Sequence, residues 1–329
     1  MKSINNLKDI DKPFKNAVVT LGNFDGVHLG HREIFRSVVK IAKALEGTSI
    51  VCTFQPHPLK MLAPDHAPRL INTPQERERL IEASCVDVLL TIPFNQELAQ
   101  LTPEEFVREV LVAKIGVKHL VVGYDYAFGR GRSGSIAFLK EQGAHYGFKV
   151  DVFGAVQKEN IVLSSTRVRQ AILSGNVDGA VALLGRHFNL EGTVVHGDGR
   201  GQGLGFATAN LETTKELLPR DGVYAAIVRY DCQNGDNESC QECLAVVNIG
   251  KKPTFGDHPL TIEAHLLDTQ VDFYGDKLRV YFVKRLRDEQ KFANKEALCA
   301  TIASDIQQAR NILAETRIVE FREYLTLNK

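Results

Sequence analysis

The stretch AVVTLGNFDGVHLGH (residues 17–31) decides the fold of the first half of this chain. Its mostly apolar beginning, AVVTL, is typical of a strand that is buried on both faces of a parallel sheet. A glycine-rich turn follows at once, and a helical pattern begins within the same stretch. This strand–turn–helix order predicts the first βαβ unit of an α/β domain.

The same alternation continues along the chain to about residue 185. Two of the predicted helices open with a capping box and a proline, Thr73-Pro-Gln-Glu76 and Thr102-Pro-Glu-Glu105. Strands that alternate with helices predict a doubly wound parallel sheet. The predicted strands are 17–24, 49–54, 86–94, 119–126 and 149–156, and the predicted helices are near 30–45, 74–84, 103–114 and 135–146.

The pattern changes near residue 185, where strand-like segments begin to follow one another with short turns between them. Such a run predicts a small antiparallel β-barrel. The segment 295–315 has apolar residues at helical spacing and predicts a closing helix. We therefore expect two domains, 1–185 and 186–329. The barrel strands are expected within 192–197, 222–230, 243–250, 260–268 and 277–286.

Composition excludes several classes of protein. Lys+Arg and Asp+Glu are equal at 40 each, so no long-range field favours nucleic acid or an anionic membrane as a partner. No apolar stretch approaches the roughly 18 to 20 residues that cross a bilayer, and the first residues lack the apolar core of a secretory signal. We expect a cytoplasmic protein, and no feature of the sequence specifies an oligomeric state.

Six cysteines are scattered along the chain, which favours reduced thiols over a disulfide framework. Cys232, Cys240 and Cys243 cluster in a polar segment. A structural zinc site would need a fourth ligand, so a hairpin loop is the simpler interpretation.

His28 and His31 are the first candidates for chemistry. They lie three residues apart at the predicted start of a helix, where free N–H groups and the helix dipole favour phosphate. Gly30 allows close approach of a triphosphate, and two imidazoles could stabilise charge that develops on an α-phosphate. The alternatives are two histidines on a turn, or two ligands of a metal whose third ligand is not obvious.

Ser164-Ser-Thr-Arg167-Val-Arg169 occupies another predicted strand-to-helix junction. Hydroxyl groups and arginines at a helix start suit the β,γ-phosphates of a leaving group. Alone, the segment is better interpreted as an ordinary Ser/Thr cap with solvated arginines. Together with the histidine pair, it favours phosphate binding.

A glycine-rich segment, GDGRGQGLG (197–205), opens the second half. Its spacing fits neither a dinucleotide-binding fingerprint nor a Walker A loop. Glu263 lies in the middle of a predicted strand and, taken alone, is best interpreted as a solvated strand residue.

Four motifs in the first half occur in the order of a known family. GNFDGVHLGH, TFQPHP (53–58), VVGYDYAFGRGRSG (121–134) and LSSTRVR (163–169) resemble the FMN adenylyltransferase module of prokaryotic bifunctional riboflavin kinase/FAD synthetases. LGFATAN (204–210), GVYA, NIGKKPTF, TIEAHLLD and RLRDEQKF resemble the kinase module of the same family. The resemblance covers essentially the whole chain.

The resemblance assigns two groups of residues to the adenylyltransferase module. His28 and His31 are its expected catalytic residues, and the TFQPHP and GYDYAFGRGRSG segments are expected to lie against the flavin. The expected ATP-binding residues are His28, His31, Gly22, Asn23, Phe24, Gly30, Ser164, Ser165, Thr166, Arg167 and Arg169, and the expected flavin-binding residues are Phe54, Pro56, Pro58, Asp125, Phe128 and Arg132. For Phe54 and Phe128, core packing is the alternative.

The resemblance also implies a kinase site. Gly197 and Gly203 would cover ATP, while Thr208 and Asn210 would hold ATP and Mg²⁺ through oxygen atoms, the ligands that this ion prefers. Glu263 would be the catalytic base that accepts the proton of a ribityl hydroxyl. Arg287 is a further candidate for flavin contact, with a surface ion pair as the alternative.

The sequence thus predicts a multifunctional transferase of flavin biosynthesis, a kinase and a nucleotidyltransferase in one chain. It would phosphorylate riboflavin to FMN and then adenylylate FMN to FAD with release of pyrophosphate, using ATP in both steps. Two rival functions are open at this point. The first half could transfer a nucleotide to another phosphorylated alcohol, or the chain could be a flavin-binding regulator without catalysis.

Overall fold

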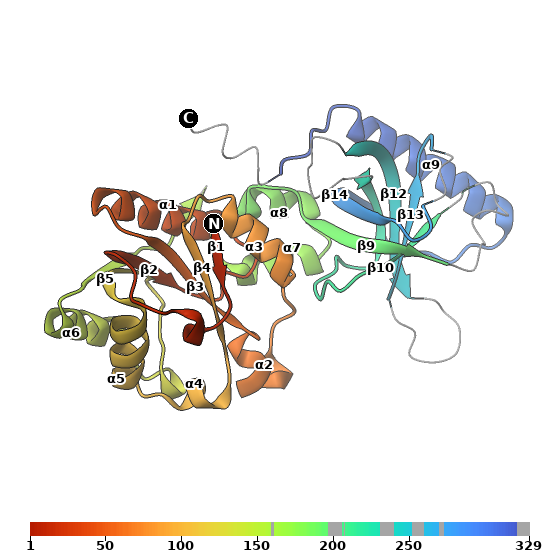
Figure 1. The fold of residues 1–329 in the computed structure, drawn as a ribbon. Helices are drawn as coiled ribbons and strands as arrows, with labels where there is room; N and C mark the ends of the chain where they lie inside the picture. The colour runs from red at the N-terminus through yellow and green to blue at the C-terminus, as the bar shows by residue number, and fades with distance from the viewer. Residues whose placement is uncertain are drawn as a thin grey trace. The chain divides into compact units, whose positions relative to one another are not determined.

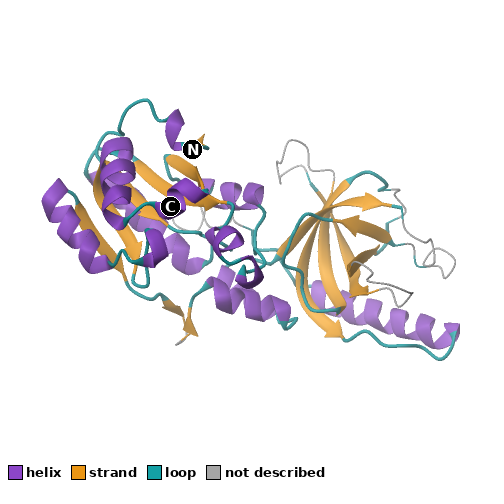
Figure 2. Cartoon of the chain, turned by 90° about the horizontal axis from the view of Figure 1, so that it is seen from below, coloured by secondary structure: helices purple, strands orange, loops and turns teal. Residues whose placement is uncertain are grey.

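The computed structural model describes residues 1–158, 161–196, 206, 208–230, 240–251, 260–269 and 273–320. The chain forms two compact units, which divide between Ser165 and Thr166. The first unit is built on a parallel sheet and the second on a closed antiparallel barrel (Figures 1 and 2). The predicted fold class, an α/β domain followed by a small barrel with a closing helix, is confirmed.

Six parallel strands form the sheet of the first unit, in the order β1-β4-β3-β2-β5-β6. All five residues of the central strand β2 are buried, which explains why its sequence is an apolar run rather than an alternation. The five predicted strands are present, and an edge strand of three residues, β1, joins them by pairing with β4. The strands are β1 Lys2–Ile4, β2 Ala17–Leu21, β3 Ser49–Gln55, β4 Val88–Pro93, β5 Val117–Gly123 and β6 Lys149–Phe153.

Helices cover both faces of this sheet. Val38 and Ala42 of α1 pack with Val18 of β2 on one face. The next residue of the strand, Val19, packs in a separate cluster with Phe106. Both predicted capping boxes are confirmed at α3 and α5. The helices are α1 Leu29–Ala44, α2 Pro58–Leu62, α3 Pro74–Glu82, α4 Gln96–Gln100, α5 Pro103–Glu105, the π-helix η3 Phe106–Ile115 and α6 Ile136–Tyr146, with 3₁₀ turns η1 Leu7–Asp9, η2 Pro64–His66 and η4 Arg130–Arg132.

The second unit begins with two helices and continues into the barrel. The barrel order is β10-β13-β12-β11-β14-β9, and antiparallel pairing of β9 with β10 closes it. The β10 strand begins within the ATAN segment (207–210) and continues to Glu212, and the sequence pattern did not predict it as a strand. The short pair β7 Gln157–Lys158 and β8 Ile161–Val162 still belongs to the first unit. The elements that follow are α7 Ser165–Leu173, α8 Val177–Leu184, β9 Asn189–Val195, β10 Ala209–Glu212, β11 Gly222–Tyr230, β12 Gln241–Lys251, β13 Leu260–Leu266, β14 Lys277–Arg287 and α9 Lys295–Leu313.

The division at Ser165 precedes the domain boundary that we expect at 185/186. Helices α7 and α8 therefore group with the barrel in the compact units, whereas the sequence pattern groups them with the sheet. The functional boundary at 185/186 stays a prediction.

The closing helix α9 packs on the outside of the barrel. Ala309 and Leu313 join a cluster with Val223 and Ala225 of β11 and with Val283 of β14. The helix begins at an N-cap, Asn294, whose side chain accepts a hydrogen bond from the N–H of Ala297. Burial of this apolar face holds the predicted closing helix in place.

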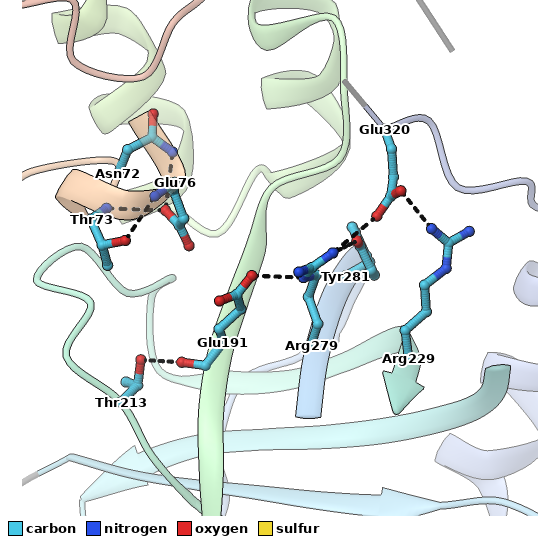
Figure 3. Close-up of polar contacts among 9 residues, drawn as sticks. All are labelled: Asn72, Thr73, Glu76, Glu191, Thr213, Arg229, Arg279, Tyr281 and Glu320. Atoms are coloured by element: carbon cyan, nitrogen blue, oxygen red, sulfur yellow. Dashed lines mark hydrogen bonds and ion pairs between the residues drawn. The ribbon is translucent and has the colours of Figure 1, made fainter. Parts of the chain in front are cut away.

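The segment after α9 is held to the barrel by buried polar contacts. Glu320 is 5% exposed and pairs with Arg229 at 2.7 Å and with Arg279 at 3.7 Å, as Figure 3 shows. The N–H of Val319 donates to Nδ1 of His187 at 3.0 Å. Burial lowers the pKa of His187, which favours the neutral imidazole that this bond requires.

The cysteines only partly follow the expectation of reduced thiols. Cys52, Cys85, Cys243 and Cys299 are free, but Cys240 is disulfide-bonded. Among the described residues, no helix combines the length and apolarity that a membrane span needs.

Candidate active sites

His28 and His31 lie together at the start of α1, at the carboxyl end of β2. His28 is the N-cap residue, and its Nδ1 accepts a hydrogen bond from the N–H of His31 at 3.4 Å. The two imidazole rings stack with their centroids 3.7 Å apart. Because Nδ1 of His28 accepts a bond, a neutral imidazole carries its proton on Nε2. The pair thus combines a ring donor with the positive end of a helix dipole.

The glycines of this segment make room for the aromatic rings beside them. A Cβ atom added to Gly30 would lie 3.1 Å from ring atoms of His28, and one added to Gly22 would lie 2.9 Å from the ring of Phe24. Phe24 is buried and meets the ring of His31 edge-on, with centroids 5.3 Å apart. The two glycines therefore leave space for the rings of Phe24 and His28, and Phe24 supports the ring of His31. This packing role is separate from any contact with ATP.

Asp25 joins the histidine segment to the second phosphate motif. Its backbone carbonyl accepts a hydrogen bond from the hydroxyl of Ser165 at 2.8 Å. Its buried carboxylate accepts bonds from the N–H groups of Ile71 and Asn72 at 2.9 and 3.3 Å. Two segments that are 140 residues apart are thus held side by side at the carboxyl end of the sheet, as the motif pair predicts.

The remaining residues of the second motif follow Ser165. Thr166, Arg167 and Arg169 lie in the first part of α7 and belong to the second unit. Their contact with the leaving phosphates, and that of Ser164, stays a prediction.

The TFQPHP segment forms the end of β3 and the start of α2. Phe54 is half-buried and meets Phe94 edge-on, with centroids 5.9 Å apart. Pro56 is exposed, and Pro58 is the first residue of α2. Phe54 also packs against the hydrophobic core of the sheet unit, which favours the core-packing interpretation for this residue. Flavin contact by Phe54, Pro56 and Pro58 stays a prediction.

Asn23 is fixed by neighbours that the sequence pattern did not single out. Its carbonyl accepts bonds from Thr53 Oγ1 at 3.3 Å and from Arg77 Nη1 at 3.2 Å, and its side-chain amide lies 3.0 Å from Nε2 of His57. The other guanidinium nitrogen of Arg77 donates to Gln55 Oε1 at 3.1 Å. These bonds connect the segment that is expected to bind ATP with the segment that is expected to bind flavin.

Arg77, which makes two of these bonds, is buried in the protein. It is 7% exposed, and burial lowers the pKa of its guanidinium while the nearby Asp25 carboxylate opposes that shift. Arg77 therefore places a positive charge beside the segment that is expected to bind ATP. Its only signal in the sequence was its position in a predicted helix, which says nothing about its partners.

The second expected flavin loop follows β5. Phe128 is 7% exposed and packs with Tyr126 at a centroid distance of 5.8 Å and with Phe106 at 5.5 Å, which favours the core-packing interpretation for this residue. Burial also raises the pKa of Tyr126. Asp125 and Arg132 are exposed and remain candidates for the flavin and its phosphate.

In the barrel, Glu263 lies in a row of polar residues across three adjacent strands. It pairs with Asn210 of β10 and with Asn248 of β12, and directly paired residues share one face of a sheet. Glu263 and Asn210 are half-buried, as is Thr208, which lies two residues before Asn210. Three of the predicted kinase residues are thus close together, and Asn248 is an addition that the sequence reasoning missed.

Arg287 has a structural partner. Its guanidinium makes three contacts of 2.7 to 3.1 Å with the carboxylate of Asp305, which is 3% exposed on α9. This geometry favours the ion-pair interpretation, and flavin contact by Arg287 stays a prediction. The predicted ATP-covering residues Gly197 and Gly203 lie outside the described residues.

A metal could be held by oxygen atoms of the barrel rather than by a cluster of strong ligands. Within the described ranges, no group of three or more His, Cys, Asp or Glu residues is arranged to hold a metal ion. The described part of the chain therefore gives no support to a metal held by His28 and His31. The hydroxyl of Thr208 and the amide of Asn210 are hard oxygen donors beside a carboxylate, a set that suits Mg²⁺ shared with phosphates.

Comparison with known proteins agrees with this division into two sites. A family model for FAD synthetase matches residues 10–167, and one for riboflavin kinase matches residues 184–313. The chain is similar to a solved structure described as a macrolide-efflux protein from Streptococcus pneumoniae, with 35% identity, a TM-score of 0.83, and coverage of 94% of this chain and 98% of that one. Their shared fold is the sheet and barrel described above.

Two curated relatives have the same name, and each matches this chain over nearly its whole length. A bifunctional riboflavin kinase/FMN adenylyltransferase from Buchnera aphidicola is 36% identical over 93% of this chain and 95% of its own. The protein of that name from Escherichia coli K12 is 36% identical over 96% of this chain and 99% of its own. The chain belongs to the family of bifunctional riboflavin kinase/FMN adenylyltransferases.

Proposed function

We propose that the two sites catalyse two consecutive steps of flavin cofactor synthesis, each with its own set of residues. Riboflavin and ATP give FMN and ADP in the barrel, and FMN and a second ATP give FAD and pyrophosphate at the sheet. The observation that carries the proposal is the pairing of two separate motifs on each side: Asp25, in the segment of the histidine pair, with Ser165 in the sheet unit, and Asn210 with Glu263 in the barrel. A regulator without catalysis would not need both.

In adenylyl transfer, a phosphate oxygen of FMN attacks the α-phosphorus of ATP. The bond from that phosphorus to the bridging oxygen breaks, and pyrophosphate leaves with the bonding electrons. His28 and His31 are proposed to stabilise the charge on the α-phosphate, because they combine ring donors with a helix N-terminus. The ATP phosphates are proposed to contact the 22–31 segment and the residues Ser164, Ser165, Thr166, Arg167 and Arg169.

The flavin is proposed to lie against the ends of β3 and β5. Phe54, Pro56 and Pro58 offer an apolar edge for the isoalloxazine ring, and Arg132 offers a charge for the FMN phosphate. Asp125 and Phe128 complete the expected set, with Phe128 acting mainly by supporting the loop.

In the kinase reaction, the terminal ribityl oxygen of riboflavin attacks the γ-phosphorus of ATP, and ADP leaves. Glu263 is proposed to accept the hydroxyl proton. Thr208 and Asn210 are proposed to hold the phosphates and Mg²⁺, with Gly197 and Gly203 over the nucleotide and Arg287 at the flavin. Mg²⁺ would neutralise charge on the transferring phosphoryl group.

The proposed function also implies ligands, a location and domain boundaries for the protein. Riboflavin, FMN, FAD and ATP are the expected ligands, and nucleic acid and membranes are not expected partners because the charges balance. We propose a cytoplasmic location, and functional domains 1–185 and 186–329.

The direct test is incubation of the full chain with riboflavin and Mg-ATP, followed by chromatographic separation of the flavins. FMN should form first and FAD should follow. Formation of neither product would reject both activities. Formation of FMN without FAD, even from added FMN, would reject the assignment of the sheet unit and favour nucleotide transfer to another phosphorylated alcohol.

A further inference from the structure

His57 lies in the segment that is expected to bind flavin and contacts the segment that is expected to bind ATP. It is 6% exposed and is the N-cap of α2, where its Nδ1 accepts a hydrogen bond from the N–H of Leu59 at 3.2 Å. Its Nε2 lies 3.0 Å from the side-chain amide of Asn23. One imidazole thus touches both segments through its two nitrogens.

The first of these bonds fixes the tautomer of His57. A nitrogen that accepts a hydrogen bond carries no proton, so the proton of the neutral ring is on Nε2. The opposite tautomer would direct an Nδ1–H group at the N–H of Leu59. Nε2 of His57 is therefore a donor.

The tautomer in turn fixes the orientation of the Asn23 amide. The structure records Nδ2 of Asn23 at 3.0 Å from Nε2 of His57. Two donors at this distance repel each other, so we assign the opposite orientation of the amide, in which Oδ1 accepts the bond from Nε2–H. The oxygen and nitrogen of an amide are interchangeable in coordinates, and the hydrogen-bond network decides between them. The NH₂ group of Asn23 then lies on the side away from His57.

This orientation matters because Asn23 has little other freedom. Thr53 and Arg77 both donate to the backbone carbonyl of Asn23, which holds the main chain in place. The orientation of the Asn23 side chain is then set by rotation about its own bonds. An NH₂ group in the ATP segment can donate to a phosphate oxygen, whereas an amide oxygen in its place would repel it.

We propose that His57 is a positioning residue of the adenylyl-transfer site: it donates from Nε2 to Asn23 and so turns the Asn23 amide to present its NH₂ group to ATP. The inference rests on the proposed function of the sheet unit. It assigns His57 to ATP binding, although the residue lies in the segment that is expected to contact flavin.

Two substitutions separate the two nitrogens of His57. His57→Asn places an oxygen near the position of Nδ1, keeps the cap of α2 and loses the bond to Asn23. His57→Gln places an NH₂ group near the position of Nε2, keeps a donor for Asn23 and loses the cap. His66, an exposed histidine nine positions along the chain, supplies the matched control, His66→Asn.

The readout is FAD formation from FMN, with KM measured separately for ATP and for FMN. His57→Asn should raise KM for ATP by roughly tenfold, the effect of one lost hydrogen bond to a charged group, and should change KM for FMN by less than about twofold. His57→Gln should restore most of the ATP affinity, and His66→Asn should behave as the unsubstituted protein. Hydrogen exchange of the buried amides in β2 and β3 reports that the sheet unit of each sample is folded, and riboflavin phosphorylation reports the same for the barrel.

The reverse ranking, with His57→Gln impaired and His57→Asn normal, would show that His57 acts only as the cap of α2. A rise in KM for FMN rather than for ATP would also overturn the proposal. Should both variants be impaired, the Asn23→Ala background decides: His57→Asn should add nothing there, and a further tenfold rise would reject action through Asn23. Failure of the unsubstituted chain to make FAD would instead reject the proposed function itself.

Discussion

Glu320→Gln tests how the segment after α9 stabilises the barrel. Glu320 is buried, and its carboxylate lies 2.7 Å from Arg229 and 3.7 Å from Arg279 (Figure 3). The substitution keeps the volume and one oxygen of the side chain, and it removes the negative charge. Removal of one partner of a buried ion pair costs about 3–5 kcal/mol when the other charge is left without compensation.

The expected cost here is smaller, because neither arginine is left alone. Arg229 also pairs with Glu242, and Arg279 also pairs with Glu191 at 2.8 Å. We therefore expect Glu320→Gln to lower the free energy of unfolding of the barrel by about 2 kcal/mol. Glu242→Gln is the matched control: its side chain is 47% exposed, so about 0.5 kcal/mol is expected.

Hydrogen exchange of the buried amides in β11 and β14, followed by mass spectrometry along a urea series, measures the stability of the barrel unit by itself. A loss for Glu320→Gln that is no larger than the loss for Glu242→Gln would refute the reasoning. It would mean that the buried charge of Glu320 contributes no more to the stability of the barrel than the exposed charge of Glu242.

Three further predictions concern the active sites and pH. Replacing His28 and His31 together by alanine should reduce FAD formation from FMN at least 100-fold and leave riboflavin phosphorylation intact, and loss of both activities in a folded chain would contradict two independent sites. Glu263→Gln should do the reverse, with FAD still made from supplied FMN. Burial lowers the pKa of His187, so the unfolded chain binds the proton more tightly and stability should fall as pH drops below the ordinary value of about 6.5. His187→Asn can accept the Val319 bond without titrating, and its melting temperature relative to the unsubstituted chain should rise on acidification; a constant difference would contradict this role.

Local patterns predicted most of the fold. The run through β2 into α1 is decided by neighbours in the sequence, and so are the two capping boxes. The edge strand β1 was missed because three residues carry no readable period and because its pairing with β4 joins residues that are far apart. The strand β10 was missed because its four residues lie in a segment that is dominated by its motif.

For the active sites too, local motifs predicted some residues and missed others. Spacing alone brought His28 and His31 to one helix start, and two short motifs identified Ser165 as their neighbour. The residues that hold this arrangement could not be found in this way. Arg77 reaches across 54 positions to the carbonyl of Asn23, and His57 reaches across 34 to its side chain. Such contacts depend on how the sheet brings distant loops together, and a short stretch of sequence holds no information about this arrangement.

The division of the chain inside the SSTRVR motif affects how the two modules can be inherited. A gene fragment that stops at Ser165 would keep the hydroxyl that bonds Asp25 but would lose both arginines of the motif. A fragment that runs to residue 185 keeps them and still ends before β9 opens the barrel. Recombination between relatives should therefore tolerate breakpoints between α8 and β9. A breakpoint at the start of α7 would separate Ser165 from Arg167 and Arg169 of the same motif, so the segment that is inherited as one module is longer than the compact unit that ends at Ser165.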